Sequence, residues 1–398
     1  MRLRSVVLVS LGAALTPSRG LFAQVPIHRL VAQADQSRAP MTVEIRAGLH
    51  RAYQFLRPEA VKALYVNAWA FSGSRLWELV RLVDSTDVNS LVVDVKDDTG
   101  CLLYRSTVET ARAIGADRCA RSNDVRARLD TLHAHGIYPI ARIVVAKDPL
   151  LAERKPGWAV RHKDGGLWRD RIGSAWVDAY NDSVWVYAAE LAHEAVALGF
   201  AEVQFDYVRL PDEPRARMAK AIFAARRDGE TAREAVRRQV RLLTSMVKPL
   251  GVPVTFDVFG LTASVTTGDL GIGQVWEDFV DVADVVLPMV YPSHYTRGAF
   301  GFRTPNAHPY SVVRLALADA LSRTATENAA QIRPYLQAFT LGRRRPRYTP
   351  AEIQAQIRAT RDAGIHTWVL WNPRSVYQRA ALPPYPSDAG RLPESGGE

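Results

Sequence analysis

Two aspartates stand in the middle of segments that otherwise have the composition of buried β-strands. Asp206 lies in EVQFDYVRLP (202–211), with Gln204 two residues before it, and Asp257 lies in PVTFDVFG (253–260). An unpaired buried carboxylate is strongly destabilising, so such a position implies either a paired charge or a functional site. Two carboxylates on neighbouring strands can act as general acid, general base or nucleophile, and glycoside hydrolysis uses such a pair.

The surroundings of the two aspartates suggest different roles for them. Lys96 and Arg142 are available as counter-charges that would keep Asp206 ionised, which suits a nucleophile or a base. Asp257 lies among aromatic and aliphatic residues, and an apolar setting raises the pKa of a carboxyl group, as an acid requires. The opposite assignment of the two roles is the alternative.

Short apolar segments alternate with longer segments of helical period along residues 58–382, which is the pattern of repeated βα units. Eight repeats predict an α/β fold with a single domain, a closed (β/α)8 TIM barrel. The alternative, an open doubly wound sheet, would need a glycine-rich phosphate loop after the first strand, and NAWAFSGS is not one. The expected strands are 61–69, 91–98, 138–146, 202–210, 253–260, 284–291, 333–340 and 367–372.

Residue types at the ends of two helical segments predict where these helices begin and end. For the helix that leads into the fourth strand, we expect Asp182 as the cap and Gly199 as the stop. For the helix that leads into the eighth strand, we expect Thr349 as the cap, Pro350 in the first turn and Gly364 as the stop.

Strand parity predicts which side chains point into the barrel. Side chains alternate across a strand, so one set faces the helices and the other faces the interior. The set rich in branched apolar residues belongs under the helices, and the polar set therefore points inward. At the carboxyl ends of the strands this fold keeps its chemistry, whereas we expect branched apolar residues in the layers below. A buried network of charges that only neutralise one another is the alternative. The predicted inward set is Asn67, Asp94, Lys96, Arg142, Gln204, Asp206, Thr255, Asp257 and Gln337.

Aromatic residues cluster near the same strand ends, where the apolar faces of sugar rings could stack on them. Trp69, Tyr207, Tyr291, Tyr295 and Trp371 are of this kind, although core packing is the alternative for each. Long connections at 99–121 and 147–181 lie on the same face, and the second contains WAVRHKDGGLWRD (158–170), which could form a cleft wall or lid. The residues expected to bind substrate are Asn67, Asp94, Lys96, Asp97, Arg142, Gln204, Tyr207, Arg209, Tyr291, His294 and Trp371.

Motifs for metal or cofactor chemistry are weak, and we expect neither a metal nor a cofactor. His133 and His135 form a His-x-His pair, but they end a helix on the face opposite the expected site. DVKDDTG does not have the ligand pattern of an EF-hand. The sequence contains neither a G-x-S-x-G elbow nor a P-loop.

The ends of the chain have the character of processing or linker segments. Residues 1–24 combine Arg2 and Arg4 with an apolar run that is short for a membrane span, so we expect a cleaved signal peptide, with an uncleaved anchor as the alternative. Export would place the protein in the periplasm or outside the cell, without stable membrane insertion after cleavage. Residues 25–57 are expected to form a linker or N-terminal wrap, and 383–398 a disordered tail.

Two further features concern the expected environment of the protein. Cys101 and Cys119 fall in one predicted loop, and a disulfide is expected there in an oxidising compartment, with two free thiols as the alternative. The net charge of +10 favours acidic partners such as anionic glycans, with a merely solvated basic surface as the alternative. The basic residues are not interleaved with aromatics in the way that base stacking requires, so we expect no nucleic acid partner.

The expected strands also carry a family resemblance. The segments YVNAWAFSG, LVVDVKDDTG, YPIARIVVAKDPLLAERKPGWAV, EVQFDYVRLP, FDVFG, LPMVYPSHY and VLWNP resemble the bacterial family called "Putative glycosyl hydrolase domain", over about residues 60–375. The resemblance implies a TIM barrel, distantly allied to the α-amylase-like barrels, and a carbohydrate substrate. It implies the nucleophile position for Asp206 and the acid position for Asp257, where those enzymes usually have glutamate. They also keep an arginine two residues before the nucleophile, where this chain has Gln204, and Arg142 could supply the missing charge.

Three functions remain open at this point. The leading hypothesis is an exported glycosidase that cleaves a poly- or oligosaccharide with two carboxylates. The first alternative is a non-catalytic barrel that binds glycans and retains its affinity when either carboxylate is removed. The second is another hydrolase of an envelope polymer, such as a deacetylase, and it would show metal dependence.

Overall fold

The computed structural model describes residues 57–324, 329–342 and 346–385. The predicted signal peptide (1–24), all but the last residue of the predicted linker and residues 386–398 of the predicted tail lie outside the described residues. We expected Pro383 and Pro384 to begin the disordered tail, but both residues pair with residues 86–87. The carbonyl oxygen of Pro383 accepts a hydrogen bond from Asp87 N at 3.0 Å, and Pro384 forms a β-bridge with Thr86.

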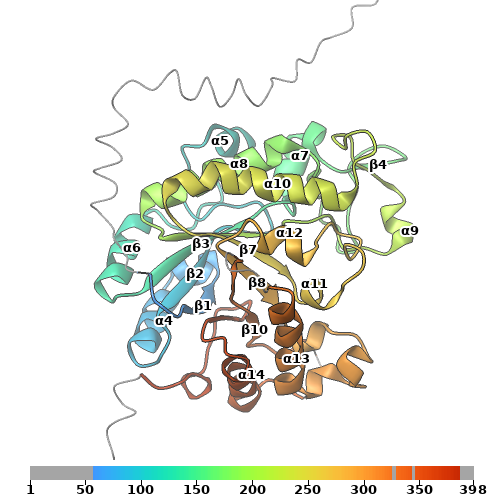
Figure 1. Cartoon of the computed structure of the whole chain (residues 1–398). Coiled ribbons are helices and arrows are strands. Elements are labelled where there is room, and N and C mark those ends of the chain that lie inside the picture. The colour runs from blue at the N-terminus through green and yellow to red at the C-terminus, as the bar shows by residue number, and fades with distance from the viewer. Residues whose placement is uncertain (1–56, 325–328, 343–345, 386–398) are drawn as a thin grey trace, which may run out of the picture. The chain divides into compact units, whose positions relative to one another are not determined.

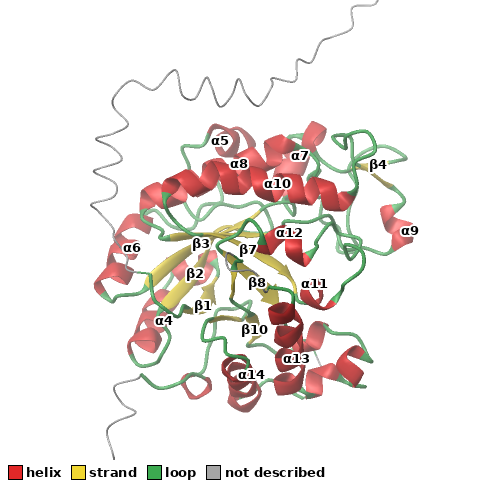
Figure 2. Cartoon of the chain, in the orientation of Figure 1, coloured by secondary structure: helices red, strands yellow, loops and turns green. Residues whose placement is uncertain are grey.

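Eight parallel strands form a closed ring, with helices outside it (Figures 1 and 2). Each strand pairs in parallel with the next, and the pairing of β10 with β8 and of β11 with β1 closes the ring. A short segment, β9 (Gln331–Ile332), pairs with β8 just before β10 begins. The predicted (β/α)8 TIM barrel is therefore confirmed. The barrel strands are β1 (Lys62–Val66), β2 (Ser90–Lys96), β3 (Tyr138–Val144), β5 (Glu202–Asp206), β7 (Val254–Phe259), β8 (Val285–Met289), β10 (Tyr335–Gln337) and β11 (Trp368–Trp371).

The helices follow the strands around the barrel, and β4 (Arg161–His162) and β6 (Ala221–Ile222) form a separate antiparallel pair. Figure 1 shows α8 and α10 side by side on one flank of the barrel, and α13 and α14 on another. Among the described residues, no helix has both the length and the apolar composition needed to cross a bilayer. The helices are α3 (Ala68–Ser72), α4 (Arg75–Asp84), α5 (Glu109–Ile114), α6 (Val125–Ala134), α7 (Pro149–Arg154), α8 (Asp182–Leu198), α9 (Arg215–Met218), α10 (Ala232–Val247), α11 (Leu261–Ser264), α12 (Trp276–Val280), α13 (Pro309–Ser322) and α14 (Pro350–Asp362).

The predicted helix boundaries are right within one residue. Thr349 caps α14 in a capping box with Glu352, and Pro350 occupies the first turn. In α8 the cap is Asn181, whose side chain accepts a hydrogen bond from Ser183 N at 3.0 Å, and not Asp182, which is the first residue of the helix. Gly199 ends α8 with φ at 118°, a conformation that glycine adopts without steric cost.

Apolar side chains form two clusters, one inside the barrel and one between the barrel and its helices. Val92 and Ile140 belong to the inner cluster, whereas Val93 and Ala141, one residue further along each strand, belong to the outer one. The alternation expected from strand parity is therefore observed on both strands, with one exception.

Lys96 is the exception, because an irregularity in β2 reverses its direction. Asp94 pairs in register with Arg142, but Lys96 pairs with Ile143, so Val95 is an extra residue in the strand. One inserted residue moves the following side chain to the other face of a sheet. The Lys96 ammonium accordingly lies outside the barrel, in contact with Asp148 and 5.2 Å from the ring centroid of Tyr187 in α8. The prediction that Lys96 points inward and keeps Asp206 ionised is wrong.

The lower layer of the barrel interior is not wholly apolar, contrary to our expectation. Glu202 and Arg333 form an ion pair there, and both side chains are completely buried. Arg333 also donates a hydrogen bond to Thr367 Oγ1 at 3.2 Å. The bottom of the barrel therefore carries a neutralised pair of charges.

The expected disulfide is present between Cys101 and Cys119, whose Cα atoms lie 5.7 Å apart. It closes the connection between β2 and α6 on the face of the barrel where the strands end.

Candidate active site

A cleft of about 560 Å³ opens at the carboxyl ends of the barrel strands. This is the end at which TIM-barrel enzymes build their active sites. Ends of strands and the connections that follow them supply its walls. Nine of the residues named from the sequence line this cleft: Arg142, Asp206, Tyr207, Arg209, Asp257, Tyr291, His294, Tyr295 and Trp371.

A single guanidinium group links the carboxylates of the site. Arg142 Nη1 binds Asp94, Arg142 Nη2 binds Asp206, and Arg142 Nε lies 3.7 Å from Asp257 Oδ2. Strand register explains the arrangement, since Asp94, Arg142 and Gln204 are paired neighbours on β2, β3 and β5. Because one guanidinium reaches both groups, Asp206 and Asp257 are closer together than the roughly 9.5 Å that limits catalytic pairs in glycoside hydrolases.

Asp257 has the environment of a carboxyl group that keeps its proton. It is 1% exposed, and its burial together with the neighbouring charge of Asp206 raises its pKa well above the ordinary value. Asp257 Oδ2 accepts a hydrogen bond from Gln204 Nε2 at 3.0 Å. Asp257 Oδ1 is buried without a hydrogen-bond partner among the described residues, which leaves no donor there to stabilise a negative charge.

Asp206 has donors on both of its oxygens, which suits an ionised carboxylate. Asp206 Oδ2 pairs with Arg142, and Asp206 Oδ1 accepts a hydrogen bond from Tyr207 N at 2.5 Å. Tyr207 itself has φ at 54°, in the left-handed region that non-glycine residues rarely adopt. Such a conformation costs about 1–3 kcal/mol and is typical of functional sites. It ends the strand alternation at this point and brings the Tyr207 ring into the wall of the cleft.

Asp94 and Gln204 do not line the cleft but support it from below. Asp94 is 3% exposed, and burial raises its pKa to about 6 against the opposing effect of Arg142. Tyr65 donates its hydroxyl hydrogen to Asp94, and Gln204 Nε2 donates to Tyr335 OH at 2.7 Å. These contacts hold the side chains that touch Asp206 and Asp257.

Aromatic rings form one wall of the cleft. Tyr291 and Trp371 stack with centroids 5.5 Å apart at 22°, and Phe339 packs edge-on against Trp371 at 5.0 Å. On the opposite strand ends, Trp176 packs against Tyr207 at 5.7 Å. A rigid apolar surface beside polar groups is the composition of a ligand pocket.

Several predicted residues lie outside the cleft. Asn67 caps α3, where its Oδ1 accepts from Ala70 N at 2.8 Å, and Asp97 Oδ1 accepts from Thr99 N at 2.9 Å within a turn. Short polar residues that satisfy neighbouring backbone groups are common at such positions. Lys96 is excluded by the irregularity in β2, and Trp69, whose side chain is largely exposed, stacks on Arg121 instead.

Strand parity and the long connection pointed to the right regions but not to every residue. The connection at 147–181 does form a wall, yet Trp176 and Arg171 line the cleft, whereas Trp168 is buried away from it. Tyr335 was missed although it shares parity with Gln337, so the alternation in its strand would have found it. Lys147 follows the end of β3 and was missed because it lies one residue outside the expected strand.

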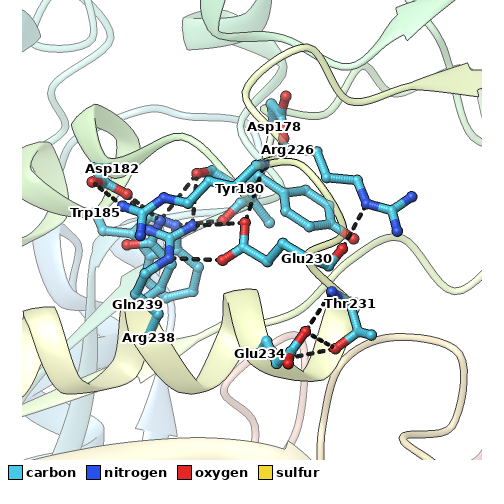
Figure 3. Close-up of polar contacts among 12 residues, drawn as sticks. Asp178, Tyr180, Asp182, Trp185, Arg226, Glu230, Thr231, Glu234, Arg238 and Gln239 are labelled. Carbon is cyan, nitrogen blue, oxygen red and sulfur yellow. Dashed lines mark hydrogen bonds and ion pairs between the residues drawn. The ribbon is translucent and has the colours of Figure 1, made fainter. Parts of the chain in front are cut away.

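A polar network holds the connection between β5 and α10, which carries part of the cleft wall (Figure 3). Arg238 of α10 pairs with Asp182 of α8 and donates two hydrogen bonds to Glu230, at 2.8 and 3.2 Å. Asp178 accepts a hydrogen bond from Ala225 N at 2.9 Å, which fixes the middle of the connection. The helices thereby position the loop that follows Asp206.

Among the described residues, no group of three or more His, Cys, Asp or Glu side chains could hold a metal ion. His135 of the His-x-His pair lies 3.0 Å from Asp84, away from the cleft.

Comparisons with known proteins agree with this architecture. A family model described as "Putative glycosyl hydrolase domain" matches residues 63–377. The structure is similar to the PgaB (BpsB) glycoside hydrolase domain from Bordetella bronchiseptica, with 12% identity, a TM-score of 0.57 and coverage of 80% of this chain and 95% of that chain. It is also similar to alpha-L-fucosidase isoenzyme 2 from Paenibacillus thiaminolyticus, with 16% identity, a TM-score of 0.52 and coverage of 81% and 47%.

A hypothetical protein from Ruminiclostridium thermocellum ATCC 27405 is 37% identical over 49% of this chain and 97% of that chain, with a TM-score of 0.44. A comparison with curated proteins found no match. At the low identities of the first two structures, the similarity shows the barrel fold alone.

Proposed function

Since the chain belongs to the family described as "Putative glycosyl hydrolase domain", we propose that it hydrolyses glycosidic bonds of a poly- or oligosaccharide, with Asp206 and Asp257 as the reacting pair. The observation that carries the proposal is the shared contact of Arg142 with both carboxyl groups, of which Asp257 has a pKa raised by burial and by Asp206. A carboxyl group with a raised pKa beside one that accepts hydrogen bonds on both of its oxygens has the properties of an acid and its partner.

The proposed mechanism assigns one role to each group. Asp257, whose pKa is raised by burial and by Asp206, donates its proton to the glycosidic oxygen as the bond to the anomeric carbon breaks. Asp206 attacks that carbon directly if the enzyme is retaining, or removes a proton from the attacking water if it is inverting. The positive charge of Arg142 offsets the negative charges of the carboxylates while the charge on Asp257 changes. Tyr291 and Trp371 offer a stacking surface for a sugar ring.

A panel of purified envelope and plant polysaccharides tests the proposal. Mass spectrometry of the soluble fragments should show oligosaccharide release by the wild type and none above background by Asp206→Asn or Asp257→Asn. Asp228→Asn is the matched control, because it makes the same chemical change at an exposed position outside the cleft. Fragment release that persists in both site variants would show that these carboxylates are not the reacting pair.

We also propose that the protein is exported, on the basis of the basic start and the apolar run within residues 1–24. Expression of the full chain followed by cell fractionation and N-terminal sequencing tests this. We expect a mature protein in the periplasm or medium that begins near residue 25. An intact first residue on a membrane-bound protein would support the anchor instead.

A further inference from the structure

Arg209 is a buried cation in the wall of the cleft that has no carboxylate partner. It follows Asp206 by three residues and is 8% exposed. Its Nη1 donates to the carbonyl oxygen of Leu210 at 2.9 Å, and no described residue accepts a hydrogen bond from its Nε or Nη2. Asp206 and Asp212 are near enough to influence its pKa, but both lie beyond ion-pair distance.

The other buried cations of the described residues are all paired. Lys96 binds Asp148, Arg142 binds Asp94 and Asp206, and Arg333 binds Glu202. Buried charges in folded proteins are normally compensated in this way, because removing an ion from water is costly. Arg209 departs from the rule that the other buried cations of the described segments follow, and it does so beside the reacting pair.

Aromatic rings compensate the Arg209 charge only in part. The guanidinium carbon lies 4.6 Å from the ring centroid of Phe259, 4.8 Å from that of Tyr207 and 5.2 Å from that of Trp176. Cation–π contacts favour the charge, but burial still lowers the pKa of Arg209 below its ordinary value. Arginine remains charged despite such a shift. The rings therefore hold the planar group rigidly in place without neutralising it.

Besides the reacting pair, two acidic residues of the cleft wall are engaged by other groups, and a third, Asp212, is exposed to solvent. Asp170 accepts hydrogen bonds from Trp176 Nε1 at 2.9 Å and from two backbone amides, and Glu213 pairs with Arg217 at 3.3 Å. Lys147 lies 5.4 Å from the centroid of the Tyr207 ring, but Asp98 pairs with it at 2.6 Å and compensates its charge. Arg209 is therefore the cation of this wall that lacks an ion-pair partner among the described residues, and a negatively charged group would supply one.

We propose that Arg209 binds a carboxylate of the substrate, so that the polysaccharide carries a uronic acid or a similar carboxylated sugar next to the bond that is cleaved. Arginine presents a planar set of donors that matches a carboxylate, which explains why a rigid guanidinium stands here and not a lysine. The inference rests on the proposed function for the position of the sugar, but not for the binding of the anion.

Binding without turnover tests the inference. In the Asp206→Asn background, calorimetry would measure affinity for polygalacturonate, alginate and hyaluronan, and for the same polymers after chemical reduction of their carboxyl groups. We expect one or more acidic polymers to bind at least tenfold more tightly than their reduced forms. Adding Arg209→Met should weaken the acidic form about 10- to 100-fold and leave the reduced form unchanged. Adding Arg241→Met, on the exposed face of α10, removes the same charge and should change neither.

Two further arms keep the result decisive. Should Arg209→Met fail to fold, Arg209→Lys retains the charge without the planar fork, and a loss of preference for the acidic polymer in that variant supports the proposal equally. Equal affinity for acidic and reduced polymers, or a preference for dextran sulfate or poly(glycerol phosphate) alone, would overturn it. If a neutral polymer is cleaved equally well by the wild type and by Arg209→Met, the glycosidase proposal stands and the anion site is refuted. If an acidic polymer binds in an Arg209-dependent way but no fragments are released, the anion site stands and the glycosidase proposal is refuted.

Discussion

Replacing Arg142 by Met removes a cation that contacts three buried carboxyl groups. The side chain touches Asp94 and Asp206 and lies 3.7 Å from Asp257. Breaking a buried ion pair from one side typically costs 3–5 kcal/mol, because the remaining charge stays buried and unpaired. We therefore expect Arg142→Met to lower the free energy of unfolding by about 3–5 kcal/mol at pH 7.

The size of this loss should depend on pH and on Asp94. The pKa of Asp94 is about 6 in the native protein, and without Arg142 it would rise further. Protonation at pH 5 removes the unpaired charge, so the loss in Arg142→Met should be smaller at pH 5 than at pH 7. For the same reason, Arg142→Met combined with Asp94→Asn should lose less stability than the sum of the single variants, by about 0.5–3 kcal/mol.

Equilibrium unfolding in urea, followed by tryptophan fluorescence at pH 5 and pH 7, measures these differences. The slope of the free energy against urea concentration should stay the same in all variants, which would show that they unfold as the wild type does. Arg241→Met serves again as the exposed control. A loss in Arg142→Met no larger than in that control, or a loss equal at both pH values, would refute the electrostatic account of the site.

Three other predictions extend the test. If Asp257 is the acid, kcat/KM should fall as the pH rises through the raised pKa of Asp257. The same raised pKa stabilises the fold below the ordinary carboxyl pKa, and this stabilisation should be lost as the pH rises through the raised value. Urea unfolding of Asp257→Asn should show no such decrease in stability with pH. Arg333→Met should lower the free energy of unfolding by about 3–5 kcal/mol, and the double variant Glu202→Gln/Arg333→Met should lower it by less, because no buried charge is left unpaired. Neither variant should change the pH profile of the remaining activity, since the pair lies in the lower layer of the barrel. Replacing Cys101 and Cys119 by Ser should lower stability by about 3 kcal/mol, and the double variant should be insensitive to reductant, as a thermal melt with and without dithiothreitol would show.

The fold could be predicted because it depends on patterns that the sequence displays directly. Eight apolar segments separated by helical periods determine a barrel, and alternation along each strand separates its two faces. Parity placed Arg142, Gln204, Asp206 and Asp257 inside the barrel, and the structure brings these four side chains into contact.

The errors arose where one inserted or rotated residue changes the direction of a side chain. The extra residue in β2 turns Lys96 outward, away from the cleft. Tyr207 lines the cleft as expected, but it does so through a positive φ that strand parity does not predict. Neither follows from residue types, because both depend on register and on backbone conformation in the folded barrel. The pairing of Glu202 with Arg333 was missed for a related reason, since the two residues are 131 positions apart in the chain.

Hydrolysis in water enriched in heavy oxygen tests the central claim most directly. If the protein cleaves glycosidic bonds by the proposed route, each fragment released by the wild type should carry one heavy oxygen at its new reducing end, beyond the slow exchange seen when fragments are incubated without enzyme. The label should be absent with Asp206→Asn and Asp257→Asn. Heavy oxygen in released acetate, or fragments without any label, would show that a different bond is broken and would contradict the account.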